Sequence, residues 1–226
     1  QEVADLAIVA HMAALKGRVP FLNFFDGFRT SHEIQKIEVL EEKDYKSFLP
    51  EKELREFKNR GLNPESPSVK GTAQNPDIFF QNREAANKYF EQLPEIIVKY
   101  MKEVSKATGR EYKPFKYYGH KEATDIVIAM GSVTQALEET VDYLIGKDKK
   151  VGVLKVHLFR PFVKEYLLDE IPKTVERIAV LDRTKEPGAL GEPLYQEIRS
   201  MFYGTENPPE IIGGRYGLGS KYVNPS

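Results

Sequence analysis

The sequence predicts an α/β fold built around a parallel sheet, and three observations support this prediction. Beyond residue 119, apolar runs of strand length alternate with amphipathic stretches of helical length, as they do in βαβ units. An apolar run at residues 21–25, bounded by Pro20 and Gly27, is typical of a strand buried on both faces. The chain of 226 residues is 41% apolar, which is enough for an ordinary core.

Composition and charge exclude several classes of function. Lys and Arg total 33 against 34 Asp and Glu, so there is no global basic field to attract nucleic acid or an anionic membrane. The absence of cysteine excludes disulfides, thiolate nucleophiles and cysteine-ligated zinc or iron–sulfur centres within the chain. The N-terminal apolar stretch carries Glu2 and Asp5, lacks a basic leader and is too short to span a bilayer. We therefore expect a cytoplasmic protein that binds neither nucleic acid nor membrane.

The first half is expected to contain helices and two short strands. Apolar residues at helical spacing predict a helix over residues 2–16 that ends near Gly17. Pro50 and Gly61 have the positions expected at the start and end of a helix. A long helix over about 84–106 contains Pro94, which should kink or divide it. The other expected elements are a strand at 21–25, a helical turn from Thr30, a strand at 37–40 and an irregular loop over 63–76.

The second half predicts a regular parallel sheet with right-handed crossovers. Its expected strands cover residues 125–130, 151–158, 177–181 and 210–213. Its expected helices cover residues 134–145, 164–171 and 193–202. Residues 119–226 are therefore predicted to fold as an autonomous unit. The two strands of the first half do not make a covered parallel sheet, so we expect that half to be the tail of a larger domain and the chain to be a fragment.

Polar residues crowd the turn that follows the strand expected at 21–25. Ligands of open α/β sheets bind at the carboxyl ends of strands, so Arg29, Thr30 and Ser31 are candidates for binding a carboxylate or phosphate beside a helix N-terminus. The structural interpretation is a capped turn in which Arg29 pairs with Asp26 or Glu33. We treat the turn as a candidate for proximity to substrate or to a domain interface.

His32 completes this candidate set. Its imidazole titrates near neutrality and can carry a proton, although a lone histidine in a polar turn more often has a structural hydrogen-bonding role. The other histidines, His11, His120 and His157, are scattered along the sequence. They suggest no metal site, and we expect no cofactor site in this chain.

Other loops offer weaker signals. Ser132 and Gln135 have the spacing of a capping box after an expected strand, and the segment lacks the glycine patterns of dinucleotide-binding folds and P-loops. Capping is therefore favoured there over anion binding. The loop at 71–77 either presents amides and a hydroxyl to a ligand or is ordinary turn chemistry. The loop at 182–188 has mixed charge suited to docking a partner domain, and the glycine-rich segment 213–220 suits flexible backbone against another surface.

Several stretches, in collinear order, carry a resemblance to a known family. They are FFDGFRTSHEIQKIEVL (24–40), GTAQNPDIFFQ (71–81), VIAMGSVTQALEETVDYL (127–144), VGVLKVHLFRPF (151–162), AVLDRTKEPGALGEPLY (179–195) and GGRYGLGS (213–220). Together they resemble pyruvate:ferredoxin (flavodoxin) oxidoreductase, a multidomain family that uses thiamine diphosphate. The resemblance implies that residues 1–82 are the C-terminal part of a thiamine pyrimidine-binding domain. It implies that residues 83–226 are a lead-in helix and a transketolase C-terminal-like, three-layer domain.

The resemblance also implies a reaction. In this family pyruvate and coenzyme A become acetyl-CoA and carbon dioxide, and electrons pass through iron–sulfur clusters to ferredoxin or flavodoxin. The family's pyrimidine-contacting glutamate and pyruvate-binding residues would lie upstream of this chain, and its G-D-G diphosphate and magnesium motif and cluster cysteines downstream. Asp26-Gly27 is not that motif, because Phe25 stands where its first glycine belongs. The segment alone is therefore expected to be inactive, and the full-length protein to be a homodimer in which this chain contacts the remaining domains.

Two alternatives stay open. The chain can be a non-catalytic α/β module for domain assembly or ligand docking, or part of an oxidoreductase for a different 2-oxoacid. The length of the full gene discriminates, since a long chain with a cysteine-rich cluster segment supports the oxidoreductase.

Overall fold

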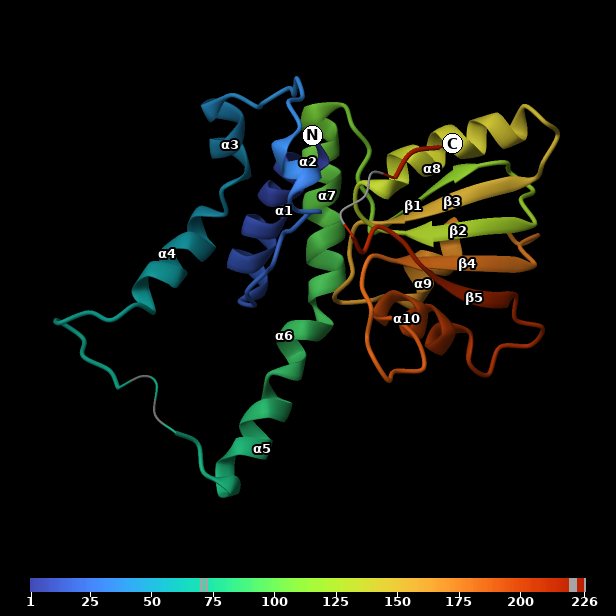
Figure 1. Cartoon of the computed structure of the whole chain (residues 1–226). Coiled ribbons are helices and arrows are strands. Elements are labelled where there is room, and N and C mark those ends of the chain that lie inside the picture. Colours follow the sequence, from blue (N-terminus) through green and yellow to red (C-terminus); the bar gives the residue numbers. More distant parts are fainter. Residues whose placement is uncertain (70, 72, 220–222, 226) are drawn as a thin grey trace. The chain divides into compact units, whose positions relative to one another are not determined.

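The backbone forms two compact units in a computed structural model that describes residues 1–69, 71, 73–219 and 223–225 (Figure 1). Unit 1 consists of Gln1–Phe24 and Lys36–Tyr112, and unit 2 of Phe25–Gln35 and Lys113–Ser226. The short segment Phe25–Gln35 therefore belongs to the second unit although the first unit flanks it in sequence. Among the described residues, no helix has the length and apolar character needed to cross a membrane.

The described part of unit 1 is helical. Its elements are α1 (Glu2–Gly17), α3 (Glu42–Phe48), α4 (Glu51–Asn59), α5 (Pro76–Ala85), α6 (Asn87–Glu91) and α7 (Leu93–Thr108). The long helices α1 and α7 pack along each other and bury Val9, Ala13, Ile97 and Val104. This helix pair is the core of the unit.

The helix predictions for this unit are confirmed, with two informative shifts. Helix α1 includes Gly17 and ends at Arg18, whose φ of 58° is left-handed. Gly17 does not end the helix; its lack of a side chain allows α7 to pack closely, because a Cβ there would lie 2.4 Å from Leu93 Cδ2 of α7. The helix expected over 84–106 is divided, and Pro94 stands in the first turn of α7, where its missing N–H costs nothing.

Both strands predicted for the first half are wrong. Residues 21–25 and 37–40 are irregular, and Leu22 and Phe24 are 82% and 62% exposed. A strand needs a neighbour to receive its hydrogen bonds. The described part of unit 1 offers helices and one isolated bridge between Asn63 and Ser66, so the apolar run has no sheet to join. The loop at 63–76 is irregular as predicted up to Asn75, apart from Lys70 and Thr72, which lie outside the described residues.

Unit 2 is the predicted α/β sheet. Its strands are β1 (Phe115–Gly119), β2 (Asp125–Ala129), β3 (Val151–Val156), β4 (Arg177–Asp182) and β5 (Glu210–Arg215), in the spatial order β1-β3-β2-β4-β5. Strands β2 to β5 are parallel, and β1 runs antiparallel to β3 at the edge. The four parallel strands match the prediction closely. The antiparallel β1 was not predicted, and a unit starting at residue 119 would lose it.

Three helices complete the layers of unit 2. They are α8 (Val133–Ile145), α9 (Lys164–Glu170) and α10 (Pro193–Phe202), all close to their predicted bounds. Leu167 of α9 and Ile198 of α10 share one core with Ile128 and Val180 of the sheet. Lys155 points to the other face, where it forms a 2.7 Å ion pair with Glu138 of α8. The sheet therefore lies between α8 and the α9–α10 pair, which confirms the predicted three layers (Figure 1).

The α8 face of the sheet is only partly covered. A hollow of about 420 Å³ lies between α8 and strands β2, β4 and β5. Apolar side chains, including Leu137, Leu144 and Ile212, line it, and Ile212 is 59% exposed. The opposite face, under α9 and α10, holds the larger buried core.

Candidate functional site

The predicted site residues lie together in one short helical turn, α2 (Arg29–His32), which is part of unit 2. Arg29, Ser31 and His32 are exposed, and Thr30 is half-buried. The capping box expected from Thr30 is wrong, because the turn begins at Arg29 and no described side chain caps it. The backbone instead turns at Phe28, whose φ is 54°.

Local hydrogen bonds hold this turn. Ser31 Oγ donates to the Phe28 carbonyl at 3.0 Å, and His32 Nδ1 donates to the same oxygen. The His32 ring also lies 5.5 Å from the Phe28 ring. This geometry supports the structural interpretation of His32. The roles of Arg29 and Thr30 stay predictions.

Asp26, which the sequence suggested only as a possible partner of Arg29, connects this segment to the sheet of unit 2. Its Oδ2 accepts a hydrogen bond of 2.6 Å from the backbone N–H of Ser132, a residue 106 positions away. Its Oδ1 lies 3.4 Å from Nη1 of Arg183. The Asp26 side chain is 12% exposed and that of Arg183 is 22% exposed. The carboxylate is therefore an almost buried, charge-assisted cap on a helix in another part of the chain.

The contact lies where the sheet topology predicts a ligand-binding crevice. From β2 the chain crosses to β3 on one side and later to β4 on the other, so the order reverses at β2. Ser132 follows the carboxyl end of β2, and Arg183 follows the carboxyl end of β4. Such a reversal is where ligands of open α/β sheets bind, at helix N-termini that favour negative charge. Here the Asp26 carboxylate occupies that position.

Gly131 permits the close approach of Asp26. Its φ is +86°, and a Cβ at this position would lie 2.9 Å from Asp26 Oδ2. The capping box predicted for Ser132 and Gln135 is not formed by the Ser132 side chain in the described structure. The Ser132 amide donates to Asp26 instead, so the predicted capping box is wrong. No local sequence signal links positions so far apart.

Arg183 and Tyr216 close the other side of the Asp26 carboxylate. The Arg183 guanidinium lies 6.0 Å above the ring centre of Tyr216, and the Tyr216 hydroxyl donates to the Met130 carbonyl at 3.2 Å. Burial, aided by the negative charge of Asp26, raises the pKa of Tyr216 to about 12. Tyr216 is therefore neutral near pH 7 and acts as a hydrogen-bond donor and packing surface.

Asp182 makes a similar contact at the start of α10. Its buried carboxylate accepts hydrogen bonds from the amides of Leu194 and Tyr195, at 3.0 and 3.1 Å, at the start of α10. Burial raises the pKa of Asp182, and the two amide hydrogen bonds offset only part of that effect. Glu192, at the same helix start, forms a 2.9 Å ion pair with Arg215. These carboxylates are engaged in structural contacts, so none is placed as a ready general base.

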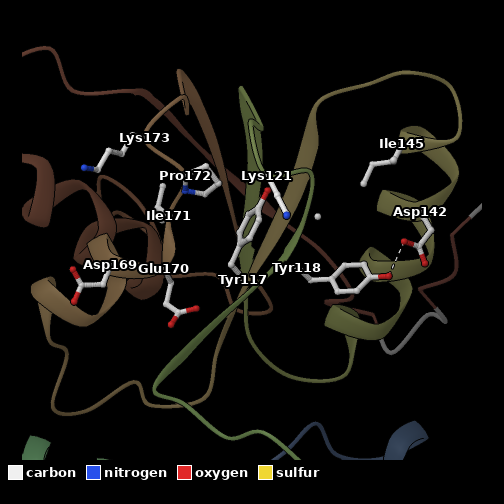
Figure 2. A pocket seen from close by; sticks show the side chains of 11 residues that line it. Tyr117, Tyr118, Lys121, Asp142, Ile145, Asp169, Glu170, Ile171, Pro172 and Lys173 are labelled. Atoms are coloured by element: carbon white, nitrogen blue, oxygen red, sulfur yellow. Dashed lines mark hydrogen bonds between the residues drawn. The ribbon is translucent and has the colours of Figure 1, made fainter.

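A larger hollow lies at the opposite end of the sheet (Figure 2). It measures about 690 Å³ and is open to solvent along β1, between the ends of α8 and α9. Its position follows from the register, since Tyr117 to Gly119 pair with the first half of β3. The lining carries both signs of charge, because it includes Lys121 and Lys173 as well as acidic residues such as Asp142. Tyr118 donates to Asp142 at 2.7 Å, as Figure 2 shows. The amino ends of parallel strands are an unusual place for a ligand, and the hollow contains no predicted site residue.

Two protein-family models match this chain. The model described as pyruvate flavodoxin/ferredoxin oxidoreductase, thiamine diphosphate-binding, matches residues 1–102. The model for pyruvate:ferredoxin oxidoreductase core domain II matches residues 123–226. The chain belongs to the pyruvate:ferredoxin (flavodoxin) oxidoreductase family. The predicted division at residue 83 is not decided by these matches or by the compact units, and it stays a prediction.

Relatives match over the whole chain. This chain is 56% identical over 226 residues to the pyruvate-flavodoxin oxidoreductase of Enterobacter agglomerans. It is 54% identical to the pyruvate:ferredoxin oxidoreductase of Moorella thermoacetica. The chain spans 19% of the length of each of these proteins. Among solved structures, 2-oxoglutarate:ferredoxin oxidoreductase from Magnetococcus marinus shares 17% identity with a TM-score of 0.39, over 72% of this chain and 26% of that chain.

Within the described ranges, no side-chain cluster is arranged to hold the magnesium ion of a thiamine diphosphate site. No cluster of three or more metal-ligating side chains occurs in the described ranges. Asp26, the acid that precedes a glycine in the candidate turn, is engaged by Ser132 and Arg183.

Proposed function

We propose that the complete protein is a pyruvate:ferredoxin or pyruvate:flavodoxin oxidoreductase. It converts pyruvate and coenzyme A to acetyl-CoA and carbon dioxide, and the electrons released by the decarboxylation pass to ferredoxin or flavodoxin. The observation that carries the proposal is 56% identity across the whole chain to a pyruvate-flavodoxin oxidoreductase. An alternative within the family is an enzyme for a different 2-oxoacid.

Within that protein, this chain supplies scaffold and domain contacts. The complete protein is proposed to use thiamine diphosphate, magnesium and iron–sulfur clusters, and since this chain has no cysteine, the cysteine ligands of the clusters would come from other domains. We further propose residues 1–82 as the end of the pyrimidine-binding domain and residues 83–226 as the transketolase C-terminal-like domain with its lead-in helix. The complete protein is proposed to be a cytoplasmic homodimer.

The complete purified protein, loaded with its cofactors, tests the reaction. Initial rates with pyruvate, 2-oxobutyrate and 2-oxoglutarate are compared in the presence of coenzyme A, with ferredoxin and with flavodoxin as acceptors. The highest kcat/KM is expected for pyruvate. A preference for 2-oxoglutarate would assign a different 2-oxoacid, and absence of turnover with every acid would favour a non-catalytic assembly module.

The isolated 226-residue chain tests whether catalysis requires the other domains of the complete protein. We expect it to reduce no redox dye in the presence of pyruvate and coenzyme A, because thiamine activation and electron exit both need groups assigned to other domains. Pyruvate-dependent dye reduction by the isolated chain would contradict this assignment.

A further inference from the structure

Two segments of unit 2, at Gly131 and Ser132 and at Arg183, contact the Asp26 carboxylate, and a third, at Gly217, packs against Arg183. The Ser132 amide donates to one carboxylate oxygen and Arg183 pairs with the other. Gly131 lies so close that a Cβ would clash with both carboxylate oxygens. Gly217, with a φ of +62°, permits an equally close approach to Arg183, since a Cβ there would lie 3.0 Å from its Nε. Backbone geometry on both sides is thus shaped around this one charged contact.

The contact differs in kind from an exposed ion pair. An exposed pair is well hydrated and holds nothing firmly in place. The Asp26 side chain is 12% exposed, and its partners are an amide at the start of the 13-residue helix α8 and a guanidinium restrained against Tyr216. Removing the carboxylate would leave the Ser132 amide and the Arg183 charge without this acceptor. Both groups would then bind any small anion that could reach them.

Because Asp26 and Ser132 are 106 positions apart in the sequence, their contact can hold a distant segment on unit 2. Asp26 stands at the beginning of Phe25–Gln35, a segment whose side chains are mostly exposed and whose only regular element is the four-residue turn α2 among the described residues. Such a segment has little buried apolar surface to hold it on unit 2. The largely buried Asp26 carboxylate, three residues before Arg29, can supply that restraint.

We propose that Asp26 is the positioning residue that holds Phe25–Gln35, and with it the Arg29–His32 turn, at the carboxyl ends of β2 and β4. It does so by filling an anion position made by the Ser132 amide and Arg183. The inference concerns this chain and does not rest on the proposed reaction.

The absence of cysteine allows a direct test with the full 226-residue chain. Ile34→Cys introduces a single labelling site on a fully exposed side chain within the segment, where a nitroxide label reports local mobility. Label mobility is measured in the background of Asp26→Ala, Asp26→Asn and the control Glu139→Gln, which removes one exposed acid from α8. A second label at Ser200→Cys on α10 reports whether unit 2 itself stays folded.

Asp26→Ala is expected to raise the population of mobile segment by at least about tenfold, since a hydrogen bond to a charged group is lost. Asp26→Asn should have a smaller effect, because its amide oxygen still accepts from Ser132 and only the ion pair is lost. The Ser200 label should not change. Adding Arg183→Met to Asp26→Ala should raise mobility little further, because both changes remove the same contact.

Added acetate tests whether a free carboxylate can replace the missing Asp26 side chain. In Asp26→Ala it should restore restricted mobility at concentrations where chloride at equal ionic strength does not, because the carboxylate fits the vacated position. Equal label mobility in Asp26→Ala and Glu139→Gln would overturn the proposal. Equal effects of acetate and chloride would overturn the anion position. If Asp26→Ala fails to fold, the ordering of Asp26→Asn against Glu139→Gln decides the question.

Discussion

Two buried carboxylates show how partners set the pKa of an acid in this protein. Burial acts on both Asp5 and Asp182 in the direction that raises the pKa. For Asp5, hydrogen bonds from Arg110 and Tyr112 outweigh burial, so its pKa lies below the usual value. Asp182 receives only neutral amide donors from Leu194 and Tyr195, and its pKa is raised. A cationic partner decides the direction.

Asp5 should make the stability of unit 1 sensitive to acid. Arg110 Nε donates to Asp5 Oδ2 at 2.7 Å, and Arg110 also pairs with Glu38 at 2.8 Å, so α1, the 36–40 segment and the end of α7 meet there. Because the folded pKa is lowered, the stabilisation is present above the unfolded pKa of about 3.9 and is lost as pH falls through the folded pKa.

Urea unfolding at pH 7 and at pH 3 checks the Asp5 prediction. Asp5→Asn should lower the free energy of unfolding by about 2 kcal/mol at pH 7, and the difference from wild type should shrink at pH 3. The exposed Glu91→Gln serves as control and should match wild type at both pH values. A pH-independent difference for Asp5→Asn would show that the charge of Asp5 is not what stabilises the unit.

Asp182 should matter for the start of α10. Asp182→Ala leaves the amides of Leu194 and Tyr195 without their acceptor at a buried helix start, and Leu194 is fully buried. We expect a loss of about 1 to 2 kcal/mol in the free energy of unfolding. Asp182→Asn should lose less, because its amide oxygen satisfies one of the two donors. Chemical denaturation of the three proteins measures this order, and equal stability of all three would contradict the capping role.

At the scale of elements, the sequence predicted the strands that have a clear local apolar pattern. The parallel strands β2, β3 and β4 are largely apolar runs between helices, and β3 is buried along almost its whole length. The run at 21–25 looks similar, but pairing depends on a neighbouring strand that local composition does not report. The edge strand β1, FKYYG, alternates too little to be recognised. Strand patterns were therefore reliable only where covering helices accompanied them.

For the candidate site, the sequence predicted the turn and did not predict the distant contact that anchors it. The turn at Arg29–His32 follows from its density of polar residues, and the structure places it in unit 2. Its anchor, Asp26, contacts Ser132 across 106 positions, and no spacing rule reaches that far. Asp26 instead stood in the sequence as a possible partner of Arg29. The sequence did not suggest this tertiary contact, and the local pairing of Arg29 stays a prediction.

Gly152 on β3 offers a test of packing between elements. A Cβ at this position would lie 2.2 Å from the hydroxyl and 2.6 Å from ring carbons of Tyr117 on β1. The Tyr117 ring cannot move freely, because its hydroxyl donates to the His120 carbonyl at 2.7 Å. Replacing a strand glycine by alanine normally gains up to about 1 kcal/mol, but overpacking here should cost about 1 to 3 kcal/mol.

Gly152→Ala is therefore expected to lower the free energy of unfolding despite its better strand propensity. Tyr117→Val in the same chain should reduce the penalty of Gly152→Ala, since the clashing ring is gone. Gly27→Ala is the matched control, because a Cβ there meets no atom within 4 Å. Chemical denaturation measures these three variants and Tyr117→Val alone, and a stabilising Gly152→Ala would show that β1 is not held in the described register.

At the scale of the whole molecule, apolar surface is distributed unevenly. Helix α5 buries no residue among the described ones, and its Phe79 and Phe80 are 52% and 69% exposed. The partly covered α8 face of unit 2 adds a second apolar surface. Exposed apolar patches of this kind mark interaction surfaces. Since the chain spans 19% of the length of its relatives, we propose that other parts of the complete protein cover them.

This uneven packing predicts the order of proteolysis in the isolated chain. Chymotrypsin should cut first at Phe79 and Phe80, because α5 has no packed side chains to resist local unfolding. Phe115 and Phe202 are buried in unit 2 and should be cut last. Mass spectrometry of a time course identifies the sites. Early cleavage inside the sheet, before α5 is cut, would contradict the described core.

The nicked chain should nevertheless stay in one piece under native conditions. The cut falls between α1 and α7, which bury Val9, Ala13, Ile97 and Val104 against each other, so the two fragments remain held by that helix pair. Native size-exclusion chromatography should show one peak, while denaturing electrophoresis shows two fragments. Gly17→Leu, which places a large side chain where a Cβ already lies 2.4 Å from Leu93 Cδ2, should make the nicked fragments separate. Separation of the fragments without that substitution would show that α1 and α7 do not form a stable core on their own.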